Sequence, residues 1–413
     1  MGVVYTNRNR KKYIAIGGLV AIVVIVAVVL FFLLSGNNNE STLKNFYTQI
    51  SEKKYEDMYN SLSSESQKSY DQQTFVERNQ NIYEGIEASD FQIEVTDETD
   101  NELTYNVKMN TIAGGVTFEN KTTIEDGKIV WDDSFIFPDL TQNDRVRVSE
   151  DEAIRGQILD RNGKMLAGQG EAYSVGLVRG KLNGENDYDQ LAELLGLTKE
   201  SIQKTMSASW IQDDSFVPLT TIPSTDTQLE NQLLQIPGVQ LNTVEVRTYP
   251  YGEVTSHLTG YMQQVTAEDL EKHQGEGYTE TSMIGRNGIE AAYEKQLKGT
   301  NGATISIVDE NGSTKSTVAT QEKQDGQDIT LTIDIDLQRD LYNAFDEDQS
   351  ASVAMNPTNG EVLALVSTPS FDSNDFIYGF STEEWDALNN DEDQPLTNRF
   401  RATWVPGSTM KAI

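Results

Sequence analysis

Near the N-terminus the chain holds an almost unbroken apolar run. Residues 13–34 are rich in Ile, Val, Ala and Leu and contain no charged residue. About 22 residues at about 1.5 Å each cover about 33 Å as a helix, enough for the hydrocarbon core of a bilayer. The run is also too long for the apolar region of a signal peptide. The pattern therefore predicts a transmembrane helix over 13–34.

The charges that flank this run predict its orientation. Basic residues precede it, whereas the residues that follow it from Ser35 to Glu40 carry no positive charge. Because positively charged flanks remain in the cytoplasm, residues 1–12 are predicted to be a cytoplasmic tail. Everything after the helix is then expected outside the cell, in a single-pass protein of the cell membrane.

Beyond the run, helical spacing gives way to alternation. Apolar residues recur at three- and four-residue intervals over 42–62 and 72–83, as in helices that pack by one face. Over 91–131, apolar and polar residues alternate in four segments separated by Asp, Glu, Asn and Gly turns. This order predicts a small α+β domain over 40–145, in which we find no catalytic constellation.

A second domain is predicted over 150–318. Strand-like residues lead into Asn162-Gly163, a pair typical of tight hairpin turns. Helical stretches follow around Leu191 and Leu233, and glycines punctuate the segment 249–286.

A third domain is predicted to begin at residue 329, after a polar linker over 321–328. Residues 329–335 alternate as a strand, and 337–345 are predicted to form a short helix. A hairpin then joins 351–355 to 362–366. We assign 329–413 to this domain.

Composition narrows the classes of function. The 413 residues suffice for two or three domains, and 65 acidic against 32 basic residues give a net charge of −33, which excludes nucleic acid as a partner. The absence of cysteine excludes disulfides, thiolate metal sites and a cysteine nucleophile. The only two histidines, His257 and His273, lie apart and are interpreted as structural, so neither a metal nor another cofactor is predicted.

The candidate chemistry lies at the end of the chain, in the pair Ser408 and Lys411. Pro406-Gly407 immediately before it is typical of a helix start, where free N–H groups and the helix dipole favour an oxyanion. The Ser-x-x-Lys spacing alone is weak, because it also occurs, in polar helical stretches, at Ser41/Lys44, Ser51/Lys54 and Ser201/Lys204.

On a helix, Ser408 and Lys411 share one face. A lysine whose pKa is lowered by burial can take the proton of a serine hydroxyl and make it a nucleophile. The Ser408 N–H can also contribute to an oxyanion hole. The alternative for the motif alone is a capping serine beside an exposed lysine.

Other stretches of the chain favour the nucleophile interpretation. Together with Ser-x-x-Lys, they resemble class B penicillin-binding proteins. Five blocks occur in the family's order: Arg155-Gly156 with Asp160-Arg161-Asn162-Gly163; Tyr249-Pro250-Tyr251-Gly252 with Ser256-His257-Leu258-Thr259-Gly260-Tyr261; Gly285-Arg286-Asn287-Gly288-Ile289-Glu290 with Leu297-Lys298-Gly299; Asn356-Pro357 and Gly360-Glu361 with Ser367-Thr368-Pro369-Ser370; and Pro406-Gly407-Ser408-Thr409-Met410-Lys411. Region 40–145 resembles the NTF2-like domain of the low-affinity, methicillin-resistance type.

The resemblance implies a multidomain α+β fold: a transmembrane helix, an NTF2-like domain, a dimerisation (pedestal) domain and the start of a transpeptidase domain. It implies a Gram-positive D,D-transpeptidase in which Ser408 is acylated and Lys411 is the general base. Peptidoglycan stem peptides would be the substrate, β-lactams would acylate the same serine with low affinity, and a SEDS glycosyltransferase would be a partner. Motif residues of the pedestal are interpreted as forming turns, salt bridges and packing contacts.

The sequence departs from the family in one respect. The family's Ser-x-Asn and Lys-Thr/Ser-Gly motifs are expected downstream of Ser408, and no residue follows Ile413. We therefore expect either that the natural protein is longer or that this chain is a truncation without activity of its own.

Two other functions remain open from the sequence. A non-catalytic, membrane-anchored scaffold or ligand-sensing module of wall synthesis is the main alternative. A β-lactam sensor or hydrolase fits less well, because the long pedestal is typical of class B transpeptidases.

Overall fold

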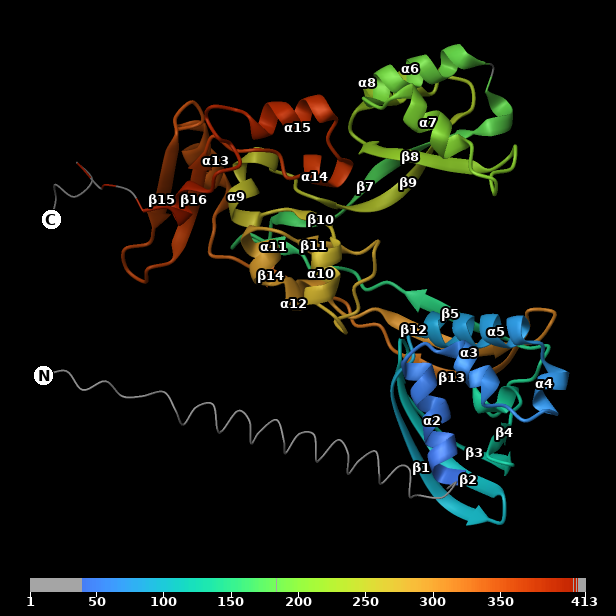
Figure 1. Cartoon of the computed structure of the whole chain (residues 1–413). Helices are drawn as coiled ribbons and strands as arrows, with labels where there is room; N and C mark the ends of the chain where they lie inside the picture. The colour runs from blue at the N-terminus through green and yellow to red at the C-terminus, as the bar shows by residue number, and fades with distance from the viewer. Residues whose placement is uncertain (1–38, 183, 404, 406, 408–413) are drawn as a thin grey trace, which may run out of the picture. The chain divides into compact units, whose positions relative to one another are not determined.

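The computed structural model describes residues 39–182, 184–403, 405 and 407 (Figure 1). The predicted transmembrane segment 13–34 lies outside the described residues, and none of the helices that are described is long and apolar enough to cross a bilayer. The chain divides into two compact units. The first comprises the described residues up to Asp151 together with Gly302–Glu322, and the second comprises Glu152–Asn301 together with the described residues from Lys323 onward.

The first unit begins with helices that pack by one apolar face, as the helical spacing predicts. The longest are α2 (Asn39–Ser51) and α5 (Gln72–Gly85), and α5 begins at Asp71, whose side chain accepts a hydrogen bond from the Thr74 N–H. The buried face of α2 consists of Leu43, Phe46, Tyr47 and Ile50. The shorter helices are α3 (Tyr55–Asn60), α4 (Ser66–Ser69) and the 3-10 turn η1 (Asp133–Phe135).

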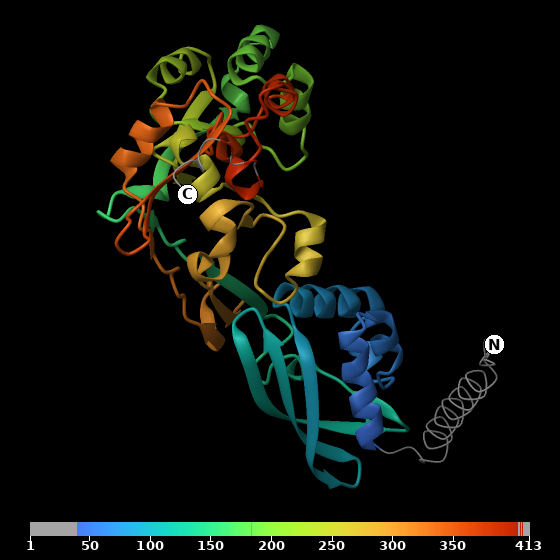
Figure 2. The same ribbon diagram turned by 90° about the vertical axis from the view of Figure 1, so that its left-hand side faces the viewer.

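A curved antiparallel sheet carries these helices on one face (Figure 2). Its strands run in the order β1 (Ser89–Thr99), β2 (Glu102–Thr111), β3 (Gly114–Glu125) and β4 (Lys128–Val130). The residues of β2 that face the helices alternate with exposed ones and are fully or almost fully buried: Leu103, Tyr105, Val107 and Met109. The predicted order of helices followed by four alternating strands is confirmed.

A later part of the chain completes the core of this first unit. Strands β5 (Arg145–Asp151), β12 (Gly302–Val308) and β13 (Thr314–Gln321) form a second sheet with β12 in the centre. Ile305 pairs with Val148 and is fully buried in the same core cluster as Phe46. Lys315 lies 2.8 Å from Asp144 and, with Thr141, lowers the pKa of that carboxyl to about 2. The first unit is therefore discontinuous in sequence.

In the second unit, one long strand organises the first half. Strand β7 (Met165–Val178) pairs with β6 (Ile158–Leu159), β8 (Phe216–Pro223) and β9 (Val239–Thr248), all antiparallel, and β14 (Ile329–Thr330) adds to β6 in parallel. The predicted turn at Asn162-Gly163 joins β6 to β7. There the buried Asp160 carboxylate accepts hydrogen bonds from the N–H groups of Asn162 and Lys164, both at 2.8 Å.

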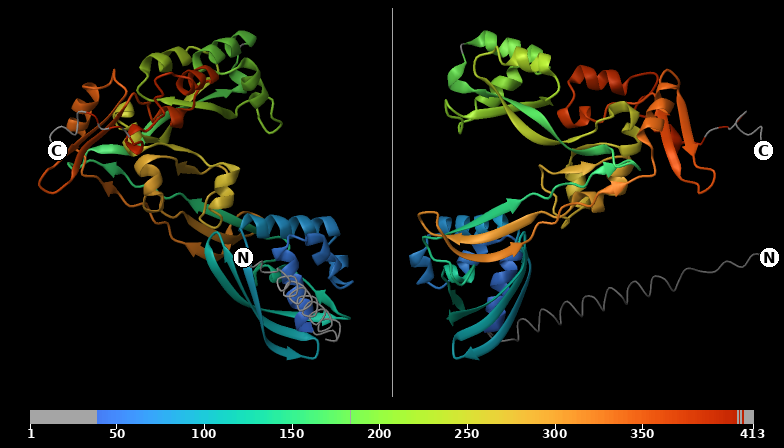
Figure 3. Two further views of the ribbon diagram at one scale, coloured as in Figure 1. Left: turned by 60° about the vertical axis from the view of Figure 1, so that its left-hand side comes forward. Right: turned by 180° about the vertical axis from the view of Figure 1, so that it is seen from behind.

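Three helices cover one face of the β7, β8 and β9 segment (Figure 3). They are α6 (Glu185–Leu195), α7 (Lys199–Met206) and α8 (Thr227–Leu233), with the 3-10 turn η2 (Arg179–Lys181) before them. Leu191 and Leu233 are fully buried, so the helical stretches predicted around them are confirmed. Leu177 of β7 belongs to the same cluster.

Short elements fill the middle of the second unit. They are η3 (Gly252–Val254), α9 (Ser256–Thr259), β10 (Met262–Gln264), α10 (Ala267–Lys272), β11 (Met283–Gly285), α11 (Gly288–Ala292) and α12 (Glu294–Lys298). Strands β10 and β11 pair antiparallel.

The last part of the second unit contains the predicted helix and hairpin. The helix is α13 (Ile335–Asn343), and the hairpin pairs β15 (Ser350–Met355) with β16 (Val362–Thr368). After them come α14 (Asp375–Tyr378), α15 (Thr382–Asn389) and the 3-10 turn η4 (Arg399–Arg401). The strand predicted over 329–335 is limited to the two residues of β14, because its partner β6 is equally short and Asp334 already caps α13.

The polar stretch 321–328 is held closely where it enters the second unit. Gly326 donates to the Ile154 carbonyl, and Gln327 donates to the Gln296 carbonyl, each at 2.8 Å. A Cβ on Gly326 would lie 1.8 Å from the Leu297 oxygen, and one on Gly156 would lie 2.1 Å from the Gln327 oxygen. Only glycine allows the three backbone segments to approach this closely, so this stretch is not a free linker.

Replacing Ile305 tests whether residues 302–322 belong to the core of the first unit. We expect Ile305→Ala to destabilise that unit by about 2–5 kcal/mol, because it removes a fully buried side chain and leaves a cavity. Hydrogen exchange should accelerate in β2 and β5 and stay unchanged in β7. Leu177→Ala, in the second unit, should give the reverse pattern. Faster exchange in β7 after Ile305→Ala would contradict this assignment.

Candidate functional site

The two residues predicted to carry the chemistry, Ser408 and Lys411, lie outside the described residues. The structure describes the segment that leads to them as far as Thr403, together with Val405 and Gly407. What it shows is therefore how the second unit holds the chain just before the motif. Three groups of contacts hold this segment. They are an ion cluster, side chains that join β16 and the following loop to the first half of this unit, and a loop built around Arg399.

The ion cluster lies where three of the pedestal motifs meet. Glu290 is fully buried and accepts hydrogen bonds from Arg155 Nε and Arg247 Nε, both at 2.8 Å. Arg155 also reaches Glu294 at 2.6 Å, and Tyr249 donates to Glu290 from 3.3 Å. A buried carboxylate is tolerated only with such partners. These contacts support the interpretation of the motif residues as salt-bridge and packing positions.

The cluster also fixes the charge states of its members. Burial alone would lower the pKa of Arg155, but Glu294 and Glu290 outweigh it and raise that pKa above its ordinary value. Burial likewise acts to raise the pKa of Glu294, and the hydrogen bonds from Arg155, Tyr278 and the Gly285 N–H lower it overall. Both groups therefore stay ionised near neutral pH.

Two amide side chains, the buried Gln338 and the half-buried Asn374, join the hairpin and the loop after it to the segment 249–254. Gln338 of α13 donates to the carbonyls of Val254 (3.0 Å) and Leu365 (2.8 Å), and its own oxygen accepts from the Leu365 N–H. Asn374 exchanges two hydrogen bonds with the backbone of Tyr249, both at 2.9 Å. Gln338 thus links β16 to the Val254 backbone, and Asn374 links the loop after β16 to Tyr249, the residue that follows β9.

The loop before η4 is built around one arginine. Arg399 is 4% exposed, and its guanidinium donates to the carbonyls of Asp393, Gln394 (3.3 Å) and Thr397 (3.2 Å). Its own N–H donates to Ser367 Oγ at the end of β16, at 3.0 Å. Burial lowers the pKa of Arg399, and Asp393 acts in the opposite direction.

His257 of α9 holds the same loop from the pedestal side. Its ring is 5% exposed, and Nε2 lies 2.9 Å from the Pro395 carbonyl oxygen. Asn398 Nδ2 in turn donates to the His257 carbonyl at 3.1 Å. Burial lowers the pKa of His257 to about 4, although the carbonyls of Pro395 and Pro369 act to raise it. A neutral ring then donates from Nε2, and the prediction that this histidine is structural fits its position.

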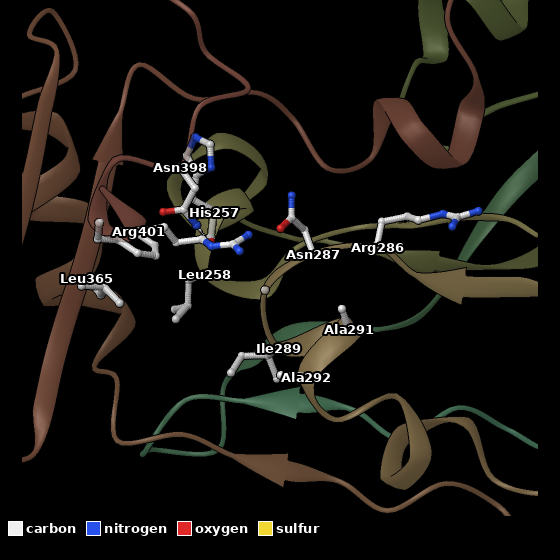
Figure 4. A pocket seen from close by; sticks show the side chains of 12 residues that line it. His257, Leu258, Arg286, Asn287, Ile289, Ala291, Ala292, Leu365, Asn398 and Arg401 are labelled. Atoms are coloured by element: carbon white, nitrogen blue, oxygen red, sulfur yellow. Dashed lines mark hydrogen bonds between the residues drawn. The ribbon is translucent and has the colours of Figure 1, made fainter. Parts of the chain in front are cut away.

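A hollow of about 470 Å³ lies beside η4 (Figure 4). Its walls come from α9, from α11 and the two residues before it, from Leu365 on β16 and from Asn398 with the η4 turn. Most of the side chains that line it are apolar or amide, with two arginines: His257, Leu258, Arg286, Asn287, Gly288, Ile289, Ala291, Ala292, Leu365, Asn398, Phe400 and Arg401. Arg286 is already paired with Asp269 at 2.7 Å.

The other serine–lysine pairs with the same spacing have ordinary surroundings. Ser51 Oγ donates to the Tyr47 carbonyl, and Ser201 Oγ donates to the Thr198 carbonyl at 2.7 Å. Lys44 and Lys54 form exposed pairs with neighbouring glutamates. These hydroxyls already have backbone acceptors, and no lysine of the three pairs is described in contact with its serine.

Sequence reasoning missed the residues that hold the loop. Arg399 and Asn398 carry no signal that separates them from solvent-facing residues of the same types, and Arg401, two positions further, is exposed. Ser367 lies in one of the family-like blocks, but nothing in that block marks it as a hydrogen-bond partner of the loop. In the part of the chain that is described, no group of three or more His, Asp or Glu residues could hold a metal ion.

Comparison with known families gives three matches along the chain. The family described as "NTF2-like N-terminal transpeptidase domain" matches residues 38–144. The "Penicillin-binding Protein dimerisation domain" matches 150–331, and the "Penicillin binding protein transpeptidase domain" matches 350–413.

Individual relatives agree with these matches. Penicillin-binding protein 3 of Bacillus subtilis is 38% identical over 392 residues, which are 91% of this chain and 58% of the relative. The peptidoglycan D,D-transpeptidase MrdA of Escherichia coli K12 is 32% identical over 284 residues, covering 66% of this chain and 44% of that protein. The chain thus spans about half the length of these relatives.

A solved structure of a complex between penicillin-binding protein PBP2 and MreC from Helicobacter pylori is also similar. It is 26% identical, covers 62% of this chain and 49% of its own, and has a TM-score of 0.46.

The lowered pKa of His257 predicts a pH dependence of the second unit's stability. The unfolded chain binds this proton near pH 6.5 and the folded chain only near pH 4. The stability that the neutral, buried His257 contributes is therefore fully present above pH 6.5. It is lost as the pH falls toward 4, by about 3 kcal/mol in total. His257→Gln should remove this part of the dependence, as measured by hydrogen exchange of β7 and β16 amides between pH 7 and 4.

The matched control is His273→Gln, which should leave the dependence as in the unchanged protein. Asp375 titrates in the same range with the opposite sign, because burial and the nearby Asp372 raise its pKa to about 6. The comparison between variants cancels that contribution. Equal pH dependence in His257→Gln and the unchanged protein would contradict the assignment.

Proposed function

This chain belongs to the class B penicillin-binding proteins, and from that premise we propose that the whole protein is a serine D,D-transpeptidase that cross-links peptidoglycan stem peptides. The carrying observation is that the transpeptidase family matches 350–413, a range that contains Ser408-Thr409-Met410-Lys411. The relative from Escherichia coli is named as a peptidoglycan D,D-transpeptidase.

In the proposed reaction, Ser408 is the nucleophile and Lys411, as the neutral amine, is the general base. Lys411 takes the hydroxyl proton while Ser408 Oγ forms a bond to the carbonyl carbon of the penultimate D-Ala. The peptide bond to the terminal D-Ala breaks, and the released amine receives the proton. An acceptor amine from a neighbouring strand then attacks the acyl ester, forms the cross-link and restores the Ser408 hydroxyl.

A β-lactam would follow the first half of this reaction. Ser408 would open the ring amide, and the tethered leaving group would stay attached, so that the adduct persists. We also propose that the affinity for β-lactams is low and that the protein contributes to β-lactam resistance. The support is the NTF2-like domain at 38–144, which resembles that of the methicillin-resistance type.

The intact mass of the whole protein, isolated from its own membrane, tests this assignment. With penicillin we expect a single adduct that maps to Ser408 and is absent from Ser408→Ala. Ser201→Ala is the matched control, because Ser201 has the same spacing to a lysine and donates to a backbone carbonyl; it should keep the adduct. A covalent adduct that persists in Ser408→Ala would refute the nucleophile.

We further propose that residues 13–34 anchor the protein in the cell membrane of a Gram-positive bacterium, with residues 1–12 in the cytoplasm and the rest outside. The support is the uncharged length of the segment and the basic residues before it. Partners at this surface would be peptidoglycan, β-lactams and wall-synthesis proteins such as a SEDS glycosyltransferase.

Membrane fractionation with alkaline carbonate tests the anchor. The protein should remain in the pellet, and protease added to intact protoplasts should digest the part after residue 35. Val23→Asp with Val26→Asp should release it, since each central charge costs about 2.5–3.5 kcal/mol of insertion. Thr42→Asp with Thr48→Asp, outside the segment, should not. Carbonate release of the unchanged protein would contradict the anchor.

A further inference from the structure

Arg399 is buried and makes several hydrogen bonds. Those that its guanidinium makes within the 393–399 loop are to backbone carbonyls. The guanidinium donates to the carbonyls of Asp393, Gln394 and Thr397, and the Arg399 N–H donates to Ser367 Oγ. Ser367 Oγ also donates to the Thr397 carbonyl at 3.4 Å. A planar guanidinium with five donors can hold several carbonyls in one fixed arrangement, which a lysine cannot do.

The loop that Arg399 organises is also held from outside. His257 reaches the Pro395 carbonyl from α9, and Asn398 returns a hydrogen bond to the His257 carbonyl. The His257 ring packs edge-on against Phe371 and Phe400, with centroids 5.1 and 6.5 Å apart. The loop is therefore fixed to the pedestal and to β16 at the same time.

The fixed loop closely precedes the predicted nucleophile motif in the chain. Turn η4 ends at Arg401. From there Ala402, Thr403 and Val405 are exposed, Val405 by 93%. Among the described residues, the 393–399 loop is therefore the nearest segment before the motif that hydrogen bonds hold to both β16 and the pedestal.

We propose that Arg399 is a positioning residue for Ser408: by holding the 393–399 loop against β16 and the pedestal, it fixes where the chain enters the nucleophile motif. The inference deepens the proposed function and rests on it. A hydroxyl displaced by about 1 Å from its productive place can cost about 100-fold in rate. Loosening this loop should therefore slow acylation before it affects binding.

The competing explanation is that Arg399 contributes only to folding. The two explanations predict different effects on the acylated fraction and on the acylation rate. A folding role lowers the fraction of protein that can be acylated and leaves the rate of the remaining molecules unchanged. A positioning role lowers the rate of every folded molecule and leaves the final extent of acylation unchanged.

The test follows acylation of the whole protein, in membranes, by a fluorescent penicillin at several concentrations. This gives the saturating acylation rate, the concentration for half-saturation and the final extent. We expect Arg399→Ala to lower the saturating rate by about 10- to 100-fold, with the half-saturating concentration and the final extent unchanged. Arg399→Lys should lower the rate less, because it keeps the charge and loses the fork.

Two further variants complete the design. Arg339→Ala is the matched control, since Arg339 is 48% exposed, pairs with Asp336 on the surface of α13 and should react like the unchanged protein. Ser367→Ala removes the acceptor of the Arg399 N–H and the donor to the Thr397 carbonyl, and keeps the guanidinium. Like Arg399→Lys, it should lower the saturating acylation rate. This variant can be measured even if Arg399→Ala does not fold.

The outcomes separate the two hypotheses. An unchanged saturating rate in Arg399→Lys and Ser367→Ala, or a reduced extent at an unchanged rate, would overturn the positioning role. Absence of any adduct at Ser408 in the unchanged protein would instead overturn the proposed function. A lowered rate with full extent in these variants, and normal behaviour of Arg339→Ala, would support Arg399 as a positioning residue.

Discussion

The second unit depends on a buried carboxylate that has to be neutralised. Glu290 has no exposed surface, and its two oxygens accept hydrogen bonds from Arg155 and Arg247, which lie 135 and 43 positions before it in the chain. Desolvating one carboxylate is costly, and removing either cation would leave that cost uncompensated. The cluster therefore forces β9, the start of α11 and the strand entry at 155–157 to assemble together.

The close backbone contacts around the cluster follow from this requirement. Arg247 also donates to the Gly156 carbonyl, and Gly156 itself contacts the backbone of Gln327 where a side chain would not fit. From this platform, Tyr249 binds Asn374 through two backbone groups, and Val254 accepts from Gln338. The hairpin and the loop before η4 are thus positioned by contacts that start at the pedestal motifs.

The first unit shows the same dependence on distant segments. Its helices and four-stranded sheet leave a space that strands β12 and β13 fill, with Ile305 and Ile307 in the same core cluster as Leu43 and Tyr105. These strands follow the first part of the second unit in the chain, so the first unit is complete only after residue 322 has been made. Each unit has its own core, and the core of the first unit needs residues that follow most of the second unit's first half in the chain.

The sequence by itself determined the family, including the NTF2-like domain, and the class and order of most elements. Those properties reside in local signals: periodicity in α2 and β2, the Asn162-Gly163 turn, and motif blocks in order. It also singled out Ser408 and Lys411, which stay predictions. Only the tertiary structure decided that β14 is two residues long, that residues 302–322 pack with the first unit, and that Arg399 is buried while Arg401 is exposed. These outcomes depend on partners far away in the chain, and no local pattern encodes which distant backbone carbonyl a side chain will meet.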